Sequence, residues 1–200
     1  MLARMHLAGA SFPLQQPHLR GLDWWLEVAP LVLPHLAAGQ ATLLRDEIAF
    51  QQHLAASPAG QALPRGPIHA DLFRDNVMFD DTAGTDRLCG LFDFYFAGTE
   101  MLLFDVAVCL NDWCSDGASG ELDEARSATF CAAYGRVRPF TAGEVRAMPA
   151  LLRAAALRFW ISRLWDWYLP REAALLQAKD PLQFERVLRS RIAVPWHPPS

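Results

Sequence analysis

The chain has 200 residues, of which 52% are hydrophobic and 20% are charged, and this is enough apolar material for a sizeable core. The composition excludes a disordered or fibrous protein, and the apolar stretches fall short of the roughly 20 residues that a membrane span needs. A net charge of −4 gives no broad basic field, so we expect neither a nucleic-acid nor a membrane partner. The four cysteines form no CxxC pair and accompany apolar segments, which indicates buried, reduced thiols and a cytoplasmic protein.

The N-terminal part is predicted to be helical. The first residues, including His6, have helical apolar spacing, and the proline-containing segment 11–21 is a loop. A second helical pattern runs over 23–36, where two prolines predict a kink or a break. The segment 42–56 has a regular apolar face and predicts an uninterrupted helix.

The centre of the chain is predicted to be β-rich. Prolines and glycines interrupt any regular element over 57–67. Two short apolar runs follow at 77–79 and 88–92, and the polar stretch 80–86 joins them. Apolar runs joined by a short turn-forming stretch are typical of a β-hairpin.

After the hairpin, the chain is predicted to be helical to its end. Thr141 and Glu144 form a capping box, and Asp180 gives a similar cap to the last helix. The sequence therefore predicts one mainly helical α+β domain over 1–200, helical over 1–56 and 96–200, with a small β-hairpin insertion within 57–95. The expected C-terminal helices cover 104–113, 122–134, 141–168 with a kink near Pro149, and 181–189.

Residues 69–76 read HADLFRDN and match the HxDLxxxN catalytic loop of protein kinases. Asp93 follows at the end of the second predicted strand. In kinase-like folds, this order of Asp, Asn, strand, turn, strand and Asp serves phosphoryl transfer from ATP.

Each of these residues suits a chemical role. Asp71 can orient an acceptor hydroxyl and take its proton, which makes it the predicted catalytic residue. The amide oxygen of Asn76 and the carboxylate of Asp93 are hard ligands suited to Mg²⁺ and its nucleotide. The alternative to a catalytic site is that the Asp and Asn side chains only bond the backbone in an Asx-turn and that His69 is a core histidine. The matched spacing favours the kinase-type site, in which we expect His69 to brace the catalytic loop rather than to transfer protons.

Several stretches resemble the homoserine kinase family of bacterial threonine biosynthesis, within the aminoglycoside and choline phosphotransferase superfamily. HxDxxxxN and the later Asp mark the superfamily, whereas LNDWC and RFWISRL point to homoserine kinase. The resemblance runs from the first residues to about residue 190. The stretches that carry it are LARMHLAGASFPLQQPHLR (2–20), IHADLFRDNVMF (68–79), LFDFY (91–95), FDVAVCLNDWC (104–114) and LRFWISRL (157–164).

The resemblance implies a two-lobed, protein-kinase-like fold of the aminoglycoside phosphotransferase type. It also implies transfer of the γ-phosphoryl group of MgATP to the side-chain hydroxyl of L-homoserine, with Asp71 as the catalytic Asp and Asn76 and Asp93 as metal ligands. The sequence has no glycine-rich turn and no lysine before the catalytic loop, since its one lysine is Lys179. We therefore expect the chain to be the C-terminal lobe of such a kinase, without the nucleotide-binding lobe and inactive alone.

Substrate contacts are predicted on two later helices. Asn111 and Asp112 suit a substrate ammonium, although a solvated helix end is equally compatible with them. Arg158 is predicted to hold the substrate carboxylate, and Arg163 is the weaker candidate because it can pair within its own helix. Asp105 is interpreted as structural, as the cap of its helix, and by the resemblance it can also brace the catalytic loop.

Three other functions compete with this reading. A kinase for another small alcohol, such as choline or an aminoglycoside, should have a more acidic acceptor pocket. A non-catalytic helical remnant would keep the loop without turnover. A metal-dependent hydrolase would use His69, Asp71 and Asp93, but the sequence lacks the HxH or HxxxH spacing of such sites. The sequence predicts no oligomeric state.

Overall fold

The computed structural model describes residues 1–80, 84, 86–169 and 178–199. These residues form a mainly helical α+β fold. The α-helices are α1 (Leu2–Gly9), α2 (Leu22–Val32), α3 (Ala38–Ala56), α4 (Pro58–Gln61), α5 (Leu102–Trp113), α6 (Glu124–Gly135), α7 (Ala142–Tyr168) and α8 (Leu182–Ala193). The strands are β1 (Arg65–Ile68), β2 (Val77–Asp80), β3 (Arg87–Leu91) and β4 (Gly98–Met101), and the short 3₁₀ helices are η1 (Leu33–His35), η2 (Arg74–Asn76) and η3 (Phe94–Phe96).

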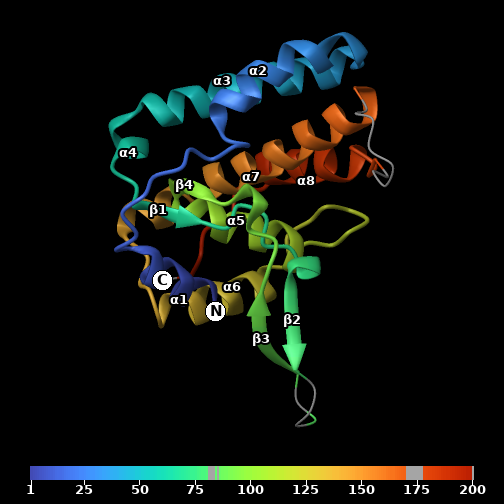
Figure 1. The fold of residues 1–200 in the computed structure, drawn as a ribbon. Helices are drawn as coiled ribbons and strands as arrows, with labels where there is room; N and C mark the ends of the chain where they lie inside the picture. Colours follow the sequence, from blue (N-terminus) through green and yellow to red (C-terminus); the bar gives the residue numbers. More distant parts are fainter. Residues whose placement is uncertain (81–83, 85, 170–177, 200) are drawn as a thin grey trace.

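The helices are stacked in tiers around α7. In Figure 1, α2 and α3 form one outer tier, α7 and α8 lie beneath them, α5 follows, and α1 and α6 lie furthest away. Helix α7 contacts α2, α5 and α8, and its side chains Leu151, Leu157 and Trp160 have no exposed surface. Burying an apolar side chain of this size contributes roughly 1.5–3 kcal/mol to the free energy of folding. Because α7 buries several such side chains among three neighbouring helices, it forms the centre of the core. No helix of the described residues is long and apolar enough to cross a bilayer.

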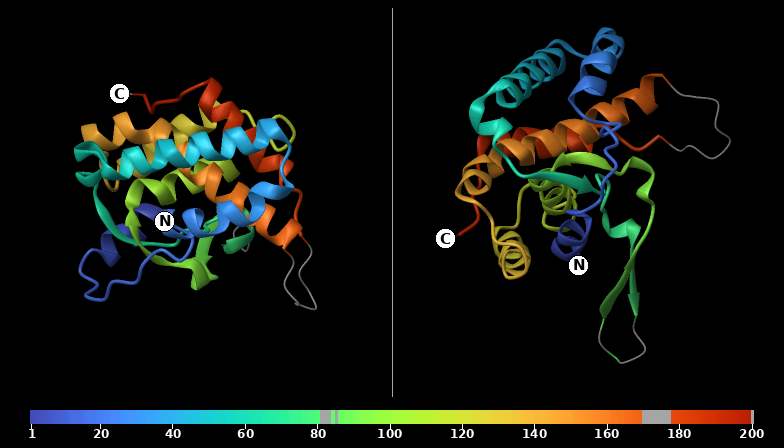
Figure 2. Two further views of the ribbon diagram at one scale, coloured as in Figure 1. Left: turned by 90° about the horizontal axis from the view of Figure 1, so that it is seen from above. Right: turned by 60° about the vertical axis from the view of Figure 1, so that its left-hand side comes forward.

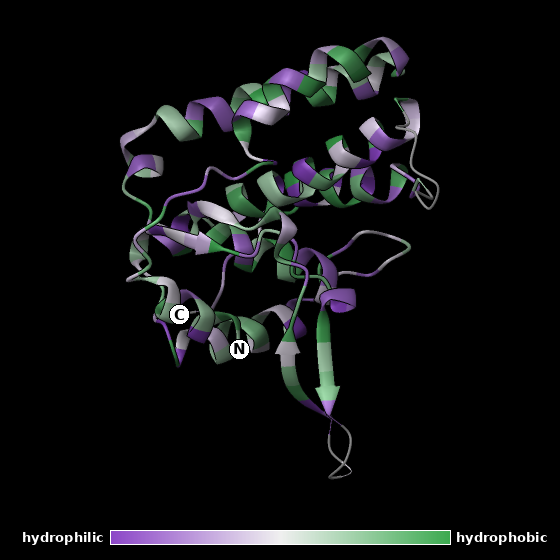
Figure 3. Cartoon of the chain, viewed as in Figure 1, coloured by the Kyte–Doolittle hydropathy of each residue, from purple (hydrophilic) through white to green (hydrophobic). Residues whose placement is uncertain are grey.

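Strands β2 and β3 form a hairpin that projects from the helical body (Figures 1 and 2). This confirms the strands predicted over 77–79 and 88–92. Figure 3 shows that β2 is hydrophobic up to its tip, where Asp80 pairs with Arg87 of β3. Residues 81–83 and 85 of the predicted connection lie outside the described residues.

A second antiparallel pair, β1 with β4, contradicts two sequence-based expectations. The segment 57–67 was expected to hold no regular element, but it contains α4 and most of β1. Strand β4 lies in the stretch expected to be helical, and its Gly98 faces Ile68 of β1. Pro67 is tolerated in β1 because a two-stranded sheet has free edges, where the missing N–H of proline costs little.

The helix predictions are confirmed with shifted ends. Thr141 Oγ1 accepts from the Glu144 N–H at 3.1 Å, as the capping box predicts. Helix α3 begins at Ala38 rather than at residue 42, and α6 begins at Glu124 because the Asp123 carboxylate accepts from the Arg126 N–H. For α6, a side-chain cap therefore sets the first helical residue, and the apolar pattern alone does not locate it.

All four cysteines are free thiols. Cys109, Cys114 and Cys131 are buried, as expected, and burial raises the pKa of each of these thiols. Cys89 is exposed, which corrects the expectation that every cysteine is buried. The difference arises because Cys89 lies on β3 of the projecting hairpin, away from the helical core.

Candidate active site

The catalytic-loop motif lies between β1 and β2 and contains a strained residue. Ala70 has a φ of 67°, in the left-handed region that residues other than glycine rarely occupy. Such a conformation costs on the order of 1–3 kcal/mol and persists only where its surroundings enforce it. The loop therefore requires a strong external constraint.

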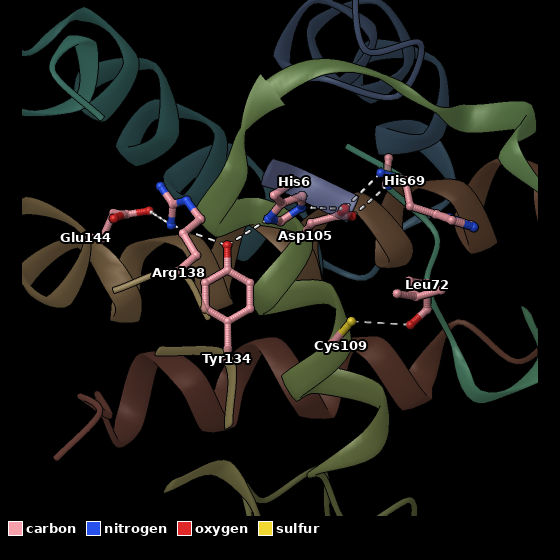
Figure 4. Close-up of polar contacts among 9 residues, drawn as sticks. His6, His69, Leu72, Asp105, Cys109, Tyr134, Arg138 and Glu144 are labelled. Atoms are coloured by element: carbon pink, nitrogen blue, oxygen red, sulfur yellow. Dashed lines mark hydrogen bonds and ion pairs between the residues drawn. The ribbon is translucent and has the colours of Figure 1, made fainter. Parts of the chain in front are cut away.

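Asp105 of α5 supplies this constraint. Its Oδ1 accepts from the Ala70 N–H at 2.7 Å, and its Oδ2 accepts from the His69 N–H at 2.8 Å (Figure 4). The Asp105 side chain has no exposed surface. The expectation that Asp105 caps its helix is wrong, because the cap position is Met101 and the carboxylate is directed at the loop. Asp105 instead braces the catalytic loop, as the resemblance implied.

His69 ties the loop to the segment that carries Asp93. The His69 Nε2 lies 2.9 Å from the Phe92 carbonyl oxygen, so this nitrogen carries the proton and donates. The ring packs on Phe94 with centroids 4.6 Å apart, and the residue has no exposed surface. These contacts suit a brace and leave no path for proton transfer to solvent.

Asn76 and Asp93 come together across the hairpin base. The Asn76 Nδ2 donates to the backbone oxygen of Asp71 at 2.7 Å. This bond uses the nitrogen end of the amide and leaves its oxygen to coordinate a metal ion. The Phe92 N–H donates to the Asn76 carbonyl at 3.2 Å, which places the next residue, Asp93, beside Asn76. Asp93 is exposed and has a φ of 62°.

This pair of oxygen donors fits a magnesium–nucleotide complex. Mg²⁺ is usually bound by one or two carboxylates together with substrate phosphates, rather than by a cage made of protein alone. In the described ranges, no group of three or more His, Cys, Asp or Glu is arranged to hold a metal. That Asn76 and Asp93 bind the metal and its nucleotide stays a prediction.

Arg158 of α7 sets the electrostatics of Asp71. Its Nη1 lies 3.3 Å from the Asp71 Oδ1, and its side chain is 3% exposed. Burial raises the pKa of Asp71, and the charge of Arg158 opposes that rise. Burial also lowers the pKa of Arg158 to about 10, which still leaves it charged at neutral pH. Arg158 therefore favours the ionised form of the predicted catalytic carboxylate.

A polar cavity of about 330 Å³ lies beside the catalytic loop. It is lined by Phe73 and Arg74 of the loop, and by Asp112, Arg163 and Lys179. The Asp112 Oδ2 accepts from the Arg74 N–H at 2.8 Å and from its Nε at 3.2 Å. The positive charge of Lys179, like that of Arg158, opposes the rise that burial causes in the pKa of Asp71. The cavity thus adjoins the loop and carries side chains of both charges.

The three predicted substrate residues have different surroundings. Asn111 and Asp112 both line the cavity. Asn111 is buried, donates to the Leu152 carbonyl at 2.8 Å and accepts from Arg191 Nε at 2.9 Å. Arg158 instead points at the carboxylate of Asp71, outside the cavity lining.

Sequence reasoning missed a second support of Asp105. The His6 Nε2 lies 3.1 Å from the Asp105 Oδ2, and the His6 Nδ1 lies 2.7 Å from the Tyr134 hydroxyl (Figure 4). His6 comes from α1, and its contact spans 99 residues of sequence. The available signal was a polar residue on the apolar face of the first predicted helix.

Comparisons with known proteins agree with this geometry. The sequence pattern of the phosphotransferase enzyme family matches residues 1–140. The chain is 57% identical over 196 residues to a homoserine kinase of Polaromonas naphthalenivorans, covering 98% of this chain and 61% of that protein. It is 56% identical over 204 residues to a homoserine kinase of Cupriavidus necator, covering 98% and 62%. The chain thus spans about three-fifths of the length of these curated relatives.

A solved structure shares the fold. An ethanolamine kinase from Plasmodium vivax superposes with a TM-score of 0.63 at 14% sequence identity, covering 97% of this chain and 58% of that protein. At so low an identity, the match shows a common kinase-like architecture and carries no information on the acceptor.

Proposed function

The chain belongs to the phosphotransferase enzyme family, and we propose that it is the C-terminal, catalytic-loop lobe of a homoserine kinase. In this proposal, the γ-phosphoryl group of MgATP is transferred to the side-chain hydroxyl of L-homoserine. The observation that carries the proposal is the loop from Asp71 to Asn76, held by Asp105 and placed beside Asp93. The identity to named homoserine kinases supports the choice of acceptor.

The residues of the loop and its neighbours have different roles in the proposed phosphoryl transfer. Asp71 orients the acceptor hydroxyl and takes its proton as the oxygen attacks phosphorus. Arg158 stabilises the charged form of Asp71, and Asp105 fixes the backbone on which Asp71 is carried. Asn76 and Asp93 would hold Mg²⁺, which would offset the charge of the phosphates. Catalysis then depends mainly on positioning and electrostatic stabilisation.

The acceptor is assigned to the polar cavity beside the loop. Asp112 offers a carboxylate to the substrate ammonium. Asn111 also lines the cavity, but it is buried and its amide holds the Leu152 carbonyl and Arg191, so Asp112 is the better candidate. Arg163 replaces Arg158 as the partner of the substrate carboxylate, since Arg163 lines the cavity whereas Arg158 serves Asp71. A cavity lined by side chains of both charges suits a zwitterionic amino acid better than a purely cationic alcohol.

Activity is to be measured in what we call the replacement enzyme. It is the Polaromonas homoserine kinase in which the stretch aligned with this chain is exchanged for residues 1–200. We propose that residues 1–200 alone have negligible turnover, because part of the phosphate clamp belongs to the segment of the relatives that this chain does not span. Substantial homoserine-dependent ADP release by the chain alone would contradict this part of the proposal.

Arg163→Ala is expected to reduce selectivity for an acceptor that carries a carboxylate. A charge-assisted hydrogen bond in a desolvated pocket is worth on the order of 2 kcal/mol, or about thirtyfold in kcat/KM. The measurement is the kcat/KM ratio of L-homoserine to 3-aminopropanol, with Arg126→Ala, an exposed arginine on α6, as control. An unchanged ratio would remove Arg163 from the pocket, and a parent preference for 3-aminopropanol would favour an amino-alcohol kinase.

Asp93→Ala is expected to weaken ADP binding about tenfold or more in the presence of Mg²⁺ and much less when the metal is chelated. The reason is that a carboxylate ligand is lost, while contacts to the nucleotide itself remain. Calorimetry on the replacement enzyme, with and without EDTA, measures the difference. Asp86→Ala, which removes an exposed carboxylate near the hairpin tip, is the control. Equal losses in both conditions would argue against ligation by Asp93.

A further inference from the structure

A continuous line of buried polar contacts runs from the catalytic loop to the start of α7. Asp105 accepts from the loop amides and lies 3.1 Å from the Nε2 of His6. The other ring nitrogen of His6 lies 2.7 Å from the Tyr134 hydroxyl on α6. His6 is 2% exposed and Tyr134 is 4% exposed, so water does not compete for these contacts. Figure 4 shows the residues in this order.

Arg138 and Glu144 form the far end of the line. Arg138 Nη1 donates to the Tyr134 hydroxyl oxygen at 3.3 Å and to Glu144 Oε1 at 2.8 Å. Glu144 has no exposed surface, and its Oε2 accepts from the Thr141 N–H at 2.8 Å. A hydroxyl can donate and accept at once, so the direction of the bond between Tyr134 and His6 follows from which ring nitrogen carries the proton.

The tautomer of His6 follows from its contact with Asp105. A carboxylate can only accept, so Nε2 carries the proton of the neutral ring, and Nδ1 accepts from the Tyr134 hydroxyl. Nε2–H then donates to Asp105, whose carboxylate has no hydrogen to give. The opposite tautomer would place a bare Nε2 against the carboxylate, which is repulsive in a buried site.

Resting on the proposed phosphotransfer, we propose that Tyr134 is a positioning residue. Its hydroxyl donates to His6 Nδ1 and so holds the His6 ring in the orientation in which Nε2–H donates to Asp105, and Asp105 in turn enforces the left-handed Ala70 next to Asp71. Tyr134 reaches the reaction only through these two residues. Without the hydroxyl, Asp105 keeps its loop contacts but loses an oriented third donor, so the loop is held less tightly.

The first test needs no variant and no activity. In residues 1–200, nitrogen NMR of the histidine rings reports which nitrogen of His6 carries the proton. The expected result is a neutral His6 protonated at Nε2. A ring protonated at Nδ1 would overturn the proposal, whether or not the chain forms part of a homoserine kinase.

The second test is Tyr134→Phe, with Tyr168→Phe of α7 as the matched control, because the Tyr168 ring stacks on His35 away from this line. In residues 1–200, we expect Tyr134→Phe to shift the Nδ1 resonance of His6, because this nitrogen loses its hydrogen-bond donor, and to speed amide exchange of Ala70 about tenfold, and Tyr168→Phe to change neither. An unchanged His6 spectrum and an unchanged Ala70 exchange rate in Tyr134→Phe would overturn the proposal.

Kinetics in the replacement enzyme separate positioning from a general loss of stability. Tyr134→Phe is expected to lower kcat on the order of tenfold while the KM for MgATP stays within about twofold. A fall in kcat no larger than that of Tyr168→Phe would overturn the link to the reaction. If the replacement enzyme has no homoserine kinase activity while the NMR results are as expected, the proposed function is wrong. The role of Tyr134 in positioning Asp105 through His6 is then still supported.

Discussion

Asp71→Asn in the replacement enzyme is expected to lower kcat for L-homoserine by a factor on the order of 10² or more, because general-base contributions have that size. The asparagine keeps the shape of the side chain but cannot take the acceptor proton. MgATP binding should be nearly unchanged, since Asn76 and Asp93 remain. The control is Asp86→Asn, which removes an exposed carboxylate near the hairpin tip, outside the cavity lining.

The pH profile provides a second readout of Asp71. Burial raises the pKa of Asp71, although Arg158 opposes the rise. As the pH falls toward this raised pKa, the base becomes protonated, so kcat/KM should begin to fall at a higher pH than for an ordinary Asp carboxyl. Asp71→Asn should abolish this acidic limb. Turnover within a few-fold of the parent, or a retained acidic limb, would remove Asp71 from the mechanism.

Asp105→Ala in residues 1–200 is expected to lower the free energy of unfolding by about 3 kcal/mol or more. The substitution leaves the buried His69 and Ala70 N–H groups without acceptors, at about 1–3 kcal/mol each. It also releases the left-handed conformation of Ala70 from its constraint. Urea unfolding measures the change.

Asp112→Ala is the matched control for Asp105→Ala, because it removes a carboxylate from the same helix that accepts from a partly exposed arginine. We expect the free energy of unfolding of this variant to fall by about 1 kcal/mol or less. If Asp105→Ala does not fold, Asp105→Asn should be intermediate, since an amide offers one acceptor oxygen instead of two. A loss for Asp105→Ala no larger than that of Asp112→Ala would show that Asp105 does not hold the loop.

Features encoded by neighbouring residues could be predicted from the sequence. The capping box at Thr141 and the hairpin are local patterns, and the catalytic loop has a spacing fixed by its own backbone contacts. The pairing of β1 with β4 joins segments that are distant in sequence, and neither strand has the alternating apolar pattern of a half-buried strand. Such pairings follow from tertiary packing and leave little local trace.

The candidate site shows the same division. Asp71, Asn76 and Asp93 were found because their chemistry and spacing are read along the chain. The contact between His6 and Asp105 was missed because it joins residues far apart in sequence. The substrate role of Asn111 stays a prediction: Asn111 lines the cavity, and its amide also holds Arg191 and the Leu152 carbonyl, contacts that the sequence does not reveal.

The most direct test of the proposed function is to follow the γ-phosphoryl group itself. The replacement enzyme is incubated with γ-labelled ATP, Mg²⁺ and an equal mixture of L-homoserine, 3-aminopropanol and ethanolamine, and the labelled products are separated. We expect the label on the side-chain oxygen of L-homoserine, and its loss with Asp71→Asn. Label on either amino alcohol in preference to L-homoserine, or only in inorganic phosphate, would contradict the assignment.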